Sequence, residues 1–424
     1  MKKSTLFLYI DITLFFLLIF GFYITSLINS SFLVPIIIIP IVLLYSNKLS
    51  FIAMKLFSNI NILIIIVFFL FSVAISTLIP ILHQTFDFSY IKNFASQLTQ
   101  FICIFSFICF ILIHKKENIS DYFEKILIYT FIIQSIIQII SFLFPQVANL
   151  IHYFYLDNDI TNLYERSGKI RGLALASSTG WGLSVGYACT FLFFTKHYLI
   201  NKKIKIPTLL MGLILFIGCF FSGRTAFLGI LLSIIYYLLS EKSKKEKIKD
   251  ILFILSFFIT IILLFLIIVP LYNSQLINKL IGFAFEPLLN YFTSGKLETT
   301  STNTLLSMWN RDISFQTYIL GDGLFTDPYT GKYYMQTDVG YLRNLFYGGF
   351  FWIVTIIVYH ITISGIFIRK KPKYQQNKLI LFLLIFSFLI EFKAMSLGFN
   401  KYLFTILLTY SLSIIADNYT NRIN

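Results

Sequence analysis

The stretch PTLLMGLILFIGCFFSGRTAFLGILLSIIYYLL, Pro207–Leu239, contains two apolar runs that are separated only by Ser222, Gly223 and Arg224. Each run is apolar enough for a helix in hydrocarbon, where a charged side chain is costly. Glycine permits a tight backbone turn, and serine can cap a helix. The stretch therefore predicts a helical hairpin whose tip, with its arginine, lies at a membrane surface.

The rest of the chain has the same character. Of its 424 residues, 57% are hydrophobic and only 12% are charged, whereas the charged fraction of a soluble domain is about 25%. This composition excludes a soluble globular protein and predicts a single all-α polytopic membrane domain over residues 1–424. About twelve apolar runs are candidate transmembrane helices: Leu6–Leu27, Phe32–Tyr45, Asn61–Pro80, Leu98–Ile113, Ile126–Phe144, Thr179–Thr195, Pro207–Phe221, Thr225–Leu239, Ile251–Pro270, Asn344–Ile368, Leu379–Ile390 and Tyr402–Ile415.

Basic residues predict the orientation of these helices. The net charge is +15, but the cations occur in short clusters between apolar runs, which indicates membrane topology rather than nucleic-acid binding. With a cytoplasmic N-terminus, 22 of the 34 Lys and Arg residues lie in cytoplasmic segments and 12 in outer ones. We therefore expect both termini in the cytoplasm, with two large outer loops at 145–178 and 271–343.

Most of the polar chemistry lies in these two loops. A transporter is expected to place polar groups at mid-membrane, and the apolar runs contain few of them: Asp11, Gln134, Gln138 and scattered serines. The working site is therefore expected at the outer boundary between membrane and water. The four cysteines lie in apolar runs and indicate neither a disulfide framework nor a metal site.

Three arginines, Arg171, Arg224 and Arg343, lie at or near the outer ends of predicted helices. A guanidinium donates two parallel hydrogen bonds to a phosphate and stays charged when desolvated. All three could therefore face one lipid headgroup, although interfacial arginines also serve simply as helix anchors. Arg224 adjoins a helix that starts at Thr225, whose N-terminus already carries partial positive charge, and a bound anion would resolve that conflict.

Several motifs between Arg171 and Ile353 resemble those of a known family. FFSGRTAFLG in the tight outer turn, WNRDI followed by YILGDGLF, and DVGYLRNLFYGGFFWI look like the O-antigen and capsular polysaccharide polymerases and the related O-antigen ligases. Polymerases of this family show an arginine, ten residues and a glycine in their outer loops. Arg171 and Gly182 have this spacing, whereas Arg311 has Asp322 at the glycine position.

The resemblance implies a GT-C-like fold in the bacterial cytoplasmic membrane and a glycosyltransferase that needs neither metal nor other cofactor. A growing glycan would move from undecaprenyl diphosphate onto a new lipid-linked repeat unit at the outer face. The implied partners are undecaprenyl-diphosphate-linked donor and acceptor glycans, membrane lipids, a chain-length regulator and a flippase, with no nucleic acid.

Candidate site residues follow from this chemistry. Fixed arginines can stabilise a diphosphate leaving group, so Arg224 is expected to be catalytic and Arg171, Arg343 and Arg311 to bind diphosphate or substrate. Tyrosines such as Tyr341 can stack on sugars, and Asp322 is also placed in the site. Asp338 is the first choice for the base that accepts the acceptor proton, although it can instead cap the following helix or pair with Arg343. Other candidate bases are Asp322, Asp312 and Glu298, and a weak metal-binding motif is Asp157–Asp159.

Two alternatives remain open. An O-antigen ligase shares the donor but uses a different acceptor lipid, and a flippase would transport lipid-linked oligosaccharide without catalysis. Ligases of this superfamily tend to have a histidine near the position of Asp338. The outer loops contain only His83 and His152, neither close to it in sequence, which favours a polymerase.

Overall fold

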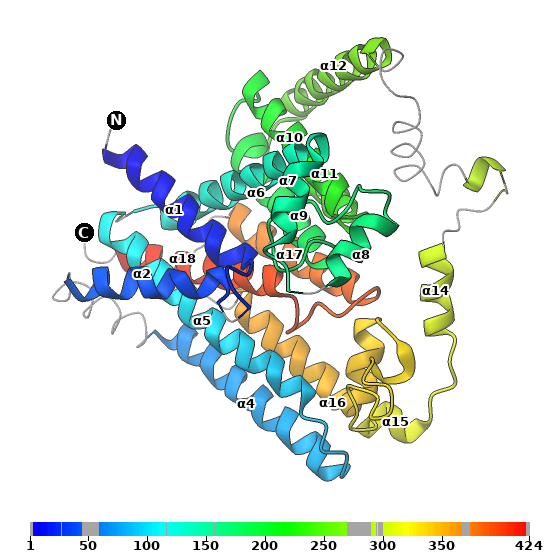
Figure 1. Ribbon diagram of the computed structural model, residues 1–424. Coiled ribbons are helices and arrows are strands. Elements are labelled where there is room, and N and C mark those ends of the chain that lie inside the picture. The colour runs from blue at the N-terminus through cyan, green and yellow to red at the C-terminus, as the bar shows by residue number, and fades with distance from the viewer. Residues whose placement is uncertain are drawn as a thin grey trace.

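The computed structural model describes residues 3–26, 28–44, 59–115, 117–156, 158–268, 290–293, 295, 300–366 and 374–420. Regular structure within these ranges is helical throughout (Figure 1). None of these residues forms a β-strand, and the extended pairs Tyr23–Asn29 and Thr326–Tyr333 are isolated bridges. The all-α class predicted from the sequence is confirmed.

Each of the twelve predicted apolar runs overlaps a helix in the described residues. Two of them form the predicted hairpin, α10 and α11, and a short π-helix, η1, continues α9. The corresponding helices are α1 (Lys3–Phe20), α2 (Ser30–Leu44), α4 (Ile60–Leu82), α5 (Ser89–His114), α6 (Ile119–Leu143), α9 (Trp181–Phe194) with η1 (Thr195–Ile200), α10 (Ile206–Ser222), α11 (Thr225–Leu238), α12 (Lys244–Ile268), α16 (Gly340–Ile363), α17 (Tyr374–Glu391) and α18 (Lys401–Thr420).

Four helices, α4, α5, α6 and α16, are long and apolar enough to cross a membrane. Shorter apolar helices lie in α1, α2, α10 and α11. The protein is therefore an all-helical, membrane-embedded protein.

Several predicted helix boundaries are wrong by five or more residues, among them the starts of α5, α6, α12 and α17 and the ends of α1 and α18. Contacts distant in sequence explain two of them. The first run was expected to extend to Leu27, but α1 ends at Phe20, because Gly21 has a φ of +52° and lies against the Lys401 ammonium. The fifth run was expected to start at Ile126, but α6 starts at Ile119. There the Asp417 carboxylate of α18 accepts hydrogen bonds from the backbone N–H groups of Ile119 (2.6 Å) and Ser120 (2.9 Å).

Helix α9 is the centre of the bundle. It packs against α6, α10, α11, α17 and α18, and its residues from Gly182 to Phe194 are buried. A Cβ at Gly229 of α11 would lie 2.3 Å from the Cβ of Ala188, so glycine allows the two helices to pack backbone to backbone. The hairpin of α10 and α11 is thereby anchored to the core.

The C-terminal end of α9 is fixed by buried charges. In the π-helix η1, Lys196 pairs with Glu124 of α6 and donates a hydrogen bond of 3.2 Å to the Tyr410 hydroxyl of α18. His197 Nδ1 lies 3.3 Å from the same carboxylate. Lys196 and Glu124 are 3% and 0% exposed, so each charge depends on the other inside the protein. This ionic group joins three helices.

Helices α4, α5 and α16 form a second packed group, which lies side by side in Figure 1. Helix α16 is broken at Gly348 and Gly349, where the backbone leaves helical geometry. Beside the break, the carbonyls of Phe346 and Tyr347 accept hydrogen bonds from the N–H groups of Asp322 (2.6 Å) and Gly323 (3.0 Å). The loop at 321–323 therefore completes the hydrogen bonding of α16.

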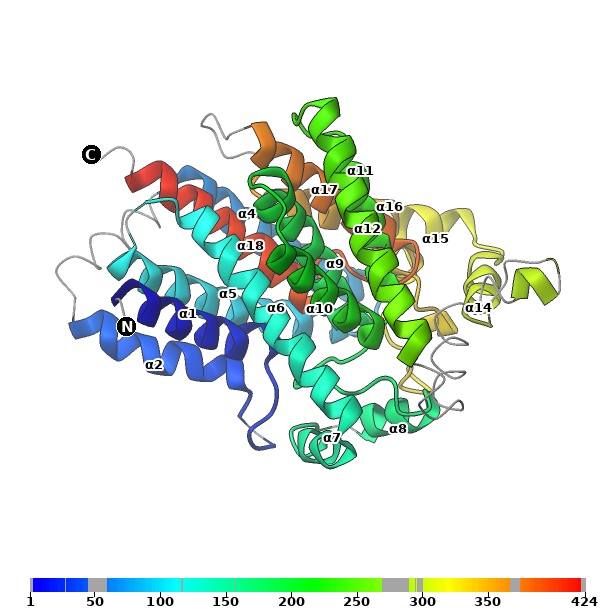
Figure 2. The same cartoon turned by 90° about the horizontal axis from the view of Figure 1, so that it is seen from above.

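The two predicted loops contain short helices. The first holds α7 (Pro145–His152) and α8 (Asn158–Arg166), and the described part of the second holds α14 (Thr300–Trp309), α15 (Phe315–Leu320) and the 3₁₀ turn η3 (Tyr334–Gln336). In Figures 1 and 2, α14 and α15 lie on the opposite side of the bundle from the start of α1 and the end of α18. The start of α1 and the end of α18 thus lie at one end of the bundle, and the short helices of the second large loop lie at the other.

The glycine contact at the break in α16 predicts a difference between two variants. Gly349 and Gly331 both have a φ of +66°, but a Cβ at Gly349 would lie 2.2 Å from the Ile319 carbonyl oxygen, whereas nothing lies within 4 Å of one at Gly331. Alanine costs about 1–2 kcal/mol at either site through backbone strain. We expect Gly349→Ala to lower the thermal unfolding midpoint in detergent clearly more than Gly331→Ala. Equal midpoints would show that α15 does not depend on this contact.

Candidate functional site

The hairpin tip has the geometry predicted from its sequence. Helix α10 ends at Ser222 and α11 begins at Thr225, leaving Gly223 and Arg224 as the turn. Gly223 has a φ of +151°, which disfavours residues with a Cβ, and its backbone N–H bonds the Cys219 carbonyl. Ser222 does not cap α11 as expected, because its hydroxyl donates to the Cys219 carbonyl (2.9 Å). Arg224 is therefore the residue that directly precedes the N-terminus of α11.

Three cations gather at this turn. A Cβ on Gly223 would lie 3.4 Å from Nη2 of Arg171, so the Arg171 guanidinium packs directly on the turn. Lys393, from the connection between α17 and α18, donates a hydrogen bond of 3.1 Å to the Thr225 hydroxyl in the first turn of α11. The sequence predicted Arg171 and Arg224 for the site, but not Lys393. We call Arg171, Arg224 and Lys393 the cation cluster.

The members of the cation cluster act on one another electrostatically. Burial, followed by the charge of Arg224, lowers the pKa of Arg171. The pKa of Lys393 is lowered by desolvation and then by the charges of Arg224 and Arg171. Lys393 is exposed as a whole residue, so this desolvation is local to the end of its side chain. An anion placed among these groups would relieve their mutual repulsion.

A buried carboxylate holds the segment that carries Lys393. Glu391, the last residue of α17, is 0% exposed. Its Oε2 atom accepts hydrogen bonds from the backbone N–H groups of Ser396 (2.6 Å) and Leu397 (2.8 Å), and from the Ser396 hydroxyl (2.6 Å). Its Oε1 atom accepts one from Asn344 Nδ2 of α16 (3.0 Å). The segment 391–397 is thus fixed to α16, and the backbone position of Lys393 with it.

The same segment reaches the second large loop through Phe392. The Trp309 indole N–H donates a hydrogen bond of 3.2 Å to the Phe392 carbonyl, and their ring centroids are 5.8 Å apart. The Tyr341 ring meets Phe392 edge-on at 4.8 Å, and its hydroxyl donates to the Phe388 carbonyl. Trp309, Tyr341 and Phe392 form an aromatic group, and Phe392 directly precedes Lys393 of the cation cluster in the sequence.

Arg343 lies in a different set of contacts from Arg171 and Arg224. Its guanidinium carbon lies 3.9 Å from the ring centre of Phe325 and 3.7 Å from that of Tyr333, and the residue is only 4% exposed. Nε and Nη2 of Arg343 have no hydrogen-bond partner among the described residues. Asp338 is exposed and interacts electrostatically with Arg343. Its neighbour Val339 occupies the N-cap of α16, so Asp338 itself is not the capping residue.

Two further predicted site residues shape the loop before α16. Asp322 accepts a hydrogen bond of 2.7 Å from the Thr317 hydroxyl, in addition to its backbone bond to Phe346. Arg311 donates a hydrogen bond to the Met335 carbonyl. Both side chains hold the second large loop in place.

The remaining candidates lie away from these contacts or outside the described residues. Asp312 is exposed, and Glu298 and Asp157 fall outside the described residues. His83 Nε2 lies 3.1 Å from the Leu320 carbonyl oxygen. His152 Nε2 lies 3.1 Å from the carbonyl oxygen of Gly172, the residue after Arg171.

No family model, curated protein or solved structure matches this chain. Its function is therefore inferred from its own residues and their contacts. The segment 391–397 links a cation cluster at a helix N-terminus to an aromatic group, and Tyr341 of that group lies close in sequence to Asp338 and Arg343. Sequence reasoning missed Glu391 and Lys393. The signal that was present is their placement in EFKAMSLGFNK, a short polar connection between two apolar runs.

The lowered pKa of Lys393 predicts how anion binding depends on pH. A lysine carries the charge that attracts an anion only below its pKa. Because the pKa of Lys393 is lowered from the ordinary lysine value of 10.5, its contribution to anion binding is lost at a lower pH than for an ordinary lysine. Binding of undecaprenyl diphosphate to the purified protein should therefore weaken as pH rises toward 10. In Lys393→Arg it should stay nearly constant over that range, because arginine remains charged. Lys332→Arg, at an exposed loop position, is the control and should follow the wild type. Matching curves for wild type and Lys393→Arg would exclude Lys393 from the site.

Proposed function

We propose that this protein is a polysaccharide polymerase of the bacterial cytoplasmic membrane, which joins undecaprenyl-diphosphate-linked repeat units into O-antigen or capsular polysaccharide. In this proposal the twelve apolar helices cross the membrane in a GT-C-like arrangement. The enzyme transfers glycans without a metal or another cofactor. The observation that carries the proposal is the cation cluster, formed at one helix N-terminus by residues from three separate parts of the chain.

The cation cluster supports diphosphate binding for three physical reasons. Two guanidinium groups and an ammonium meet at the start of α11, where the helix dipole adds positive potential. Arginine binds phosphate oxygens bidentately. The cations also disfavour one another: after burial, the charges of neighbouring arginines lower the pKa values of Arg171 and Lys393 further. A dianionic leaving group would therefore be held more strongly as its negative charge develops.

The transfer needs one bond made and one broken. The acceptor hydroxyl oxygen attacks the anomeric carbon of the donor glycan, and the bond from that carbon to the diphosphate oxygen breaks. The electron pair leaves with the diphosphate, which Arg171, Arg224 and Lys393 stabilise. Asp338 is the proposed base for the hydroxyl proton, since it is exposed and precedes α16, where Tyr341 belongs to the aromatic group. The aromatic group offers faces on which sugar rings can stack between these two ends.

The proposed orientation follows from charge. Cytoplasmic segments would hold most of the Lys and Arg residues, with both termini in the cytoplasm. The start of α1 and the end of α18 lie on one side of the bundle, and α14 and α15 lie on the other (Figure 2). Lipid-linked donor and acceptor glycans would be met at the outer surface, where a flippase delivers them and a chain-length regulator acts.

Substitutions at Arg224 and Asp338 should separate binding from turnover. Arg224→Ala should weaken binding of undecaprenyl diphosphate by tenfold or more, since a charge-assisted hydrogen bond contributes about 1.5–3 kcal/mol, and should abolish polymer in cells. Arg224→Lys should restore only part of both, because it keeps the charge but loses the guanidinium fork. Asp338→Asn should bind undecaprenyl diphosphate like the wild type yet make no polymer.

The measurements are titration of purified protein and gel analysis of surface glycan, with membrane abundance checked for each variant. Lys332→Ala, at an exposed loop position, serves as the control and should behave as the wild type. Unimpaired polymer in Arg224→Ala would contradict the proposed function, whereas normal polymer in Asp338→Asn would only assign the base to another group.

An O-antigen ligase remains the second candidate, because one histidine does approach the cation cluster. His152 contacts the Gly172 carbonyl next to Arg171, although its sequence position differs from that of the ligase histidine. A flippase is less favoured. A flippase would use polar side chains at mid-membrane to bind its substrate. Two of those in this chain are hydrogen-bonded within the protein: Asp11 to His114 (2.8 Å) and Tyr122 (2.6 Å), and Gln138 to Tyr187 (2.7 Å).

A deletion strain distinguishes the two enzymes, because they act at different steps. Loss of a polymerase should leave surface glycan with a single repeat unit, whereas loss of a ligase should remove the glycan altogether. The measurement is the banding pattern of surface glycan on a gel, with the plasmid-borne gene restoring the wild-type pattern. Complete absence of glycan would favour the ligase.

A further inference from the structure

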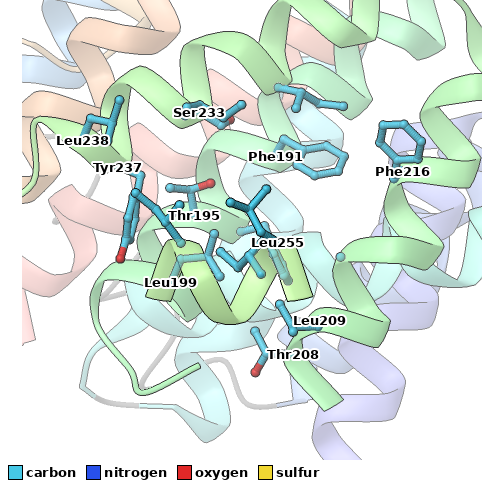
Figure 3. Close-up of a pocket in the computed structure, with 16 residues that line it drawn as sticks. Phe191, Thr195, Leu199, Thr208, Leu209, Phe216, Ser233, Tyr237, Leu238 and Leu255 are labelled. Carbon is cyan, nitrogen blue, oxygen red and sulfur yellow. The ribbon is translucent and has the colours of Figure 1, made fainter. Parts of the chain in front are cut away.

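An apolar cavity of about 480 Å³ lies between α10 and α11, the two arms of the hairpin. Its other walls come from the end of α9, from η1 and from α12. Figure 3 shows the side chains of Phe191, Leu199 and Leu255 around this space. Cavities that hold small ligands have volumes of about 300–1,000 Å³, so this one can hold a sizeable part of a hydrocarbon chain.

The cavity and the cation cluster share the same two helices. Phe216 is the lining residue of α10 nearest the tip, and its ring lies 5.7 Å from that of Phe227, which is one turn from Arg224. Ile230 is the lining residue of α11 nearest the tip, six residues or about 9 Å along the helix from Arg224. A molecule with an anionic head and a hydrocarbon tail would therefore meet cations first and an apolar channel next.

The π-helix η1 forms one wall of the cavity, at the end away from the tip. Thr195 and Leu199 of η1 line it, while their neighbour Lys196 pairs with Glu124 in the adjacent core. The buried ion pair fixes the π-helix, and the π-helix in turn forms one wall of the cavity. π-Helices are rare in proteins, and those that occur are often found at functional sites.

We infer that this cavity binds the isoprenoid chain of the lipid carrier whose diphosphate lies at the cation cluster. The inference rests on the proposed function and names where the rest of the carrier lies. It places the diphosphate at the tip of the hairpin and the first part of the chain between its arms, directed away from the sugar. The donor is thus recognised by its lipid as well as by its charge.

The position of the hairpin cavity favours the lipid carrier, rather than an ordinary membrane lipid, as the molecule that occupies it. A second apolar cavity, of about 330 Å³, lies between α4 and α5 and also touches α16 and α18. Those helices do not carry members of the cation cluster. Of these two cavities among the described residues, the hairpin cavity combines apolar walls with cations at one end, as a diphosphate on a long chain requires.

Two positions on α11 form a matched pair for the test. Ile234 is 53% exposed and lines the cavity, whereas Leu231 is 54% exposed and does not. Tryptophan at Ile234 would occupy the channel about 15 Å from Arg224, and at Leu231 it would only face lipid. The probes are undecaprenyl diphosphate and geranyl diphosphate, whose short chain ends before Ile234. Binding is measured with the full-length protein in phospholipid nanodiscs.

We expect Ile234→Trp to weaken binding of undecaprenyl diphosphate by about tenfold, or 1.4 kcal/mol, relative to Leu231→Trp. Both variants should bind geranyl diphosphate like the wild type, which also shows that they are folded. Equal affinities of the two variants for undecaprenyl diphosphate would overturn the inference. If Ile234→Trp also loses binding of geranyl diphosphate, a second pair on α12 tests the inference. Leu255 lines the cavity and Leu252 does not, so Leu255→Trp should bind undecaprenyl diphosphate more weakly than Leu252→Trp.

Arg224→Ala separates this inference from the proposed function. It should weaken both probes, because both carry the diphosphate. If Arg224→Ala binds both probes normally, the diphosphate site itself is wrong. If Arg224→Ala fails to bind while the tryptophan variants behave alike, the diphosphate site stands and the carrier chain lies elsewhere.

Discussion

Backbone N–H and C=O groups must be hydrogen-bonded within the protein wherever water is absent, and this constraint decides where the chain can leave helical geometry. Helix α16 breaks only where the loop at 321–323 supplies N–H donors to the carbonyls of Phe346 and Tyr347. The turn between α10 and α11 is two residues long and depends on the backbone freedom of Gly223. Irregular, polar segments consequently collect at the ends of the helices, and the candidate site is assembled there.

The helices themselves could be predicted because their signal is local. Each apolar run is contiguous in the sequence, and the interruption SGR marks the hairpin tip without any knowledge of the fold. Two of the boundaries that were wrong depend on partners far away in the chain. Asp417 extends α6 backward to Ile119, and Gly21 ends α1 beside Lys401. No local pattern around residues 21 or 119 contains this information.

In the candidate site, too, contacts between residues distant in sequence could not be predicted. Arg171 packs on the turn that contains Arg224 and is affected by its charge, whereas Arg343 is enclosed by Phe325 and Tyr333. Lys393 was missed because its contact with Thr225 joins residues that are distant in sequence. In the sequence, Lys393 is an ordinary cation after an apolar run. Only the fold shows that Glu391 anchors the segment and presents the lysine at the start of α11.

The consecutive residues Phe392 and Lys393 connect the two halves of the proposed reaction. Lys393 contacts the first turn of α11, and Phe392 contacts Trp309 and Tyr341. A diphosphate that binds Lys393 would therefore contact the residue next in sequence to Phe392 of the aromatic group, on which the sugar is proposed to stack. Because Glu391 already fixes this segment through four hydrogen bonds, little conformational entropy remains to be lost when the donor binds. The carrier chain, the diphosphate and the sugar would then each meet a preformed surface in that order along the molecule.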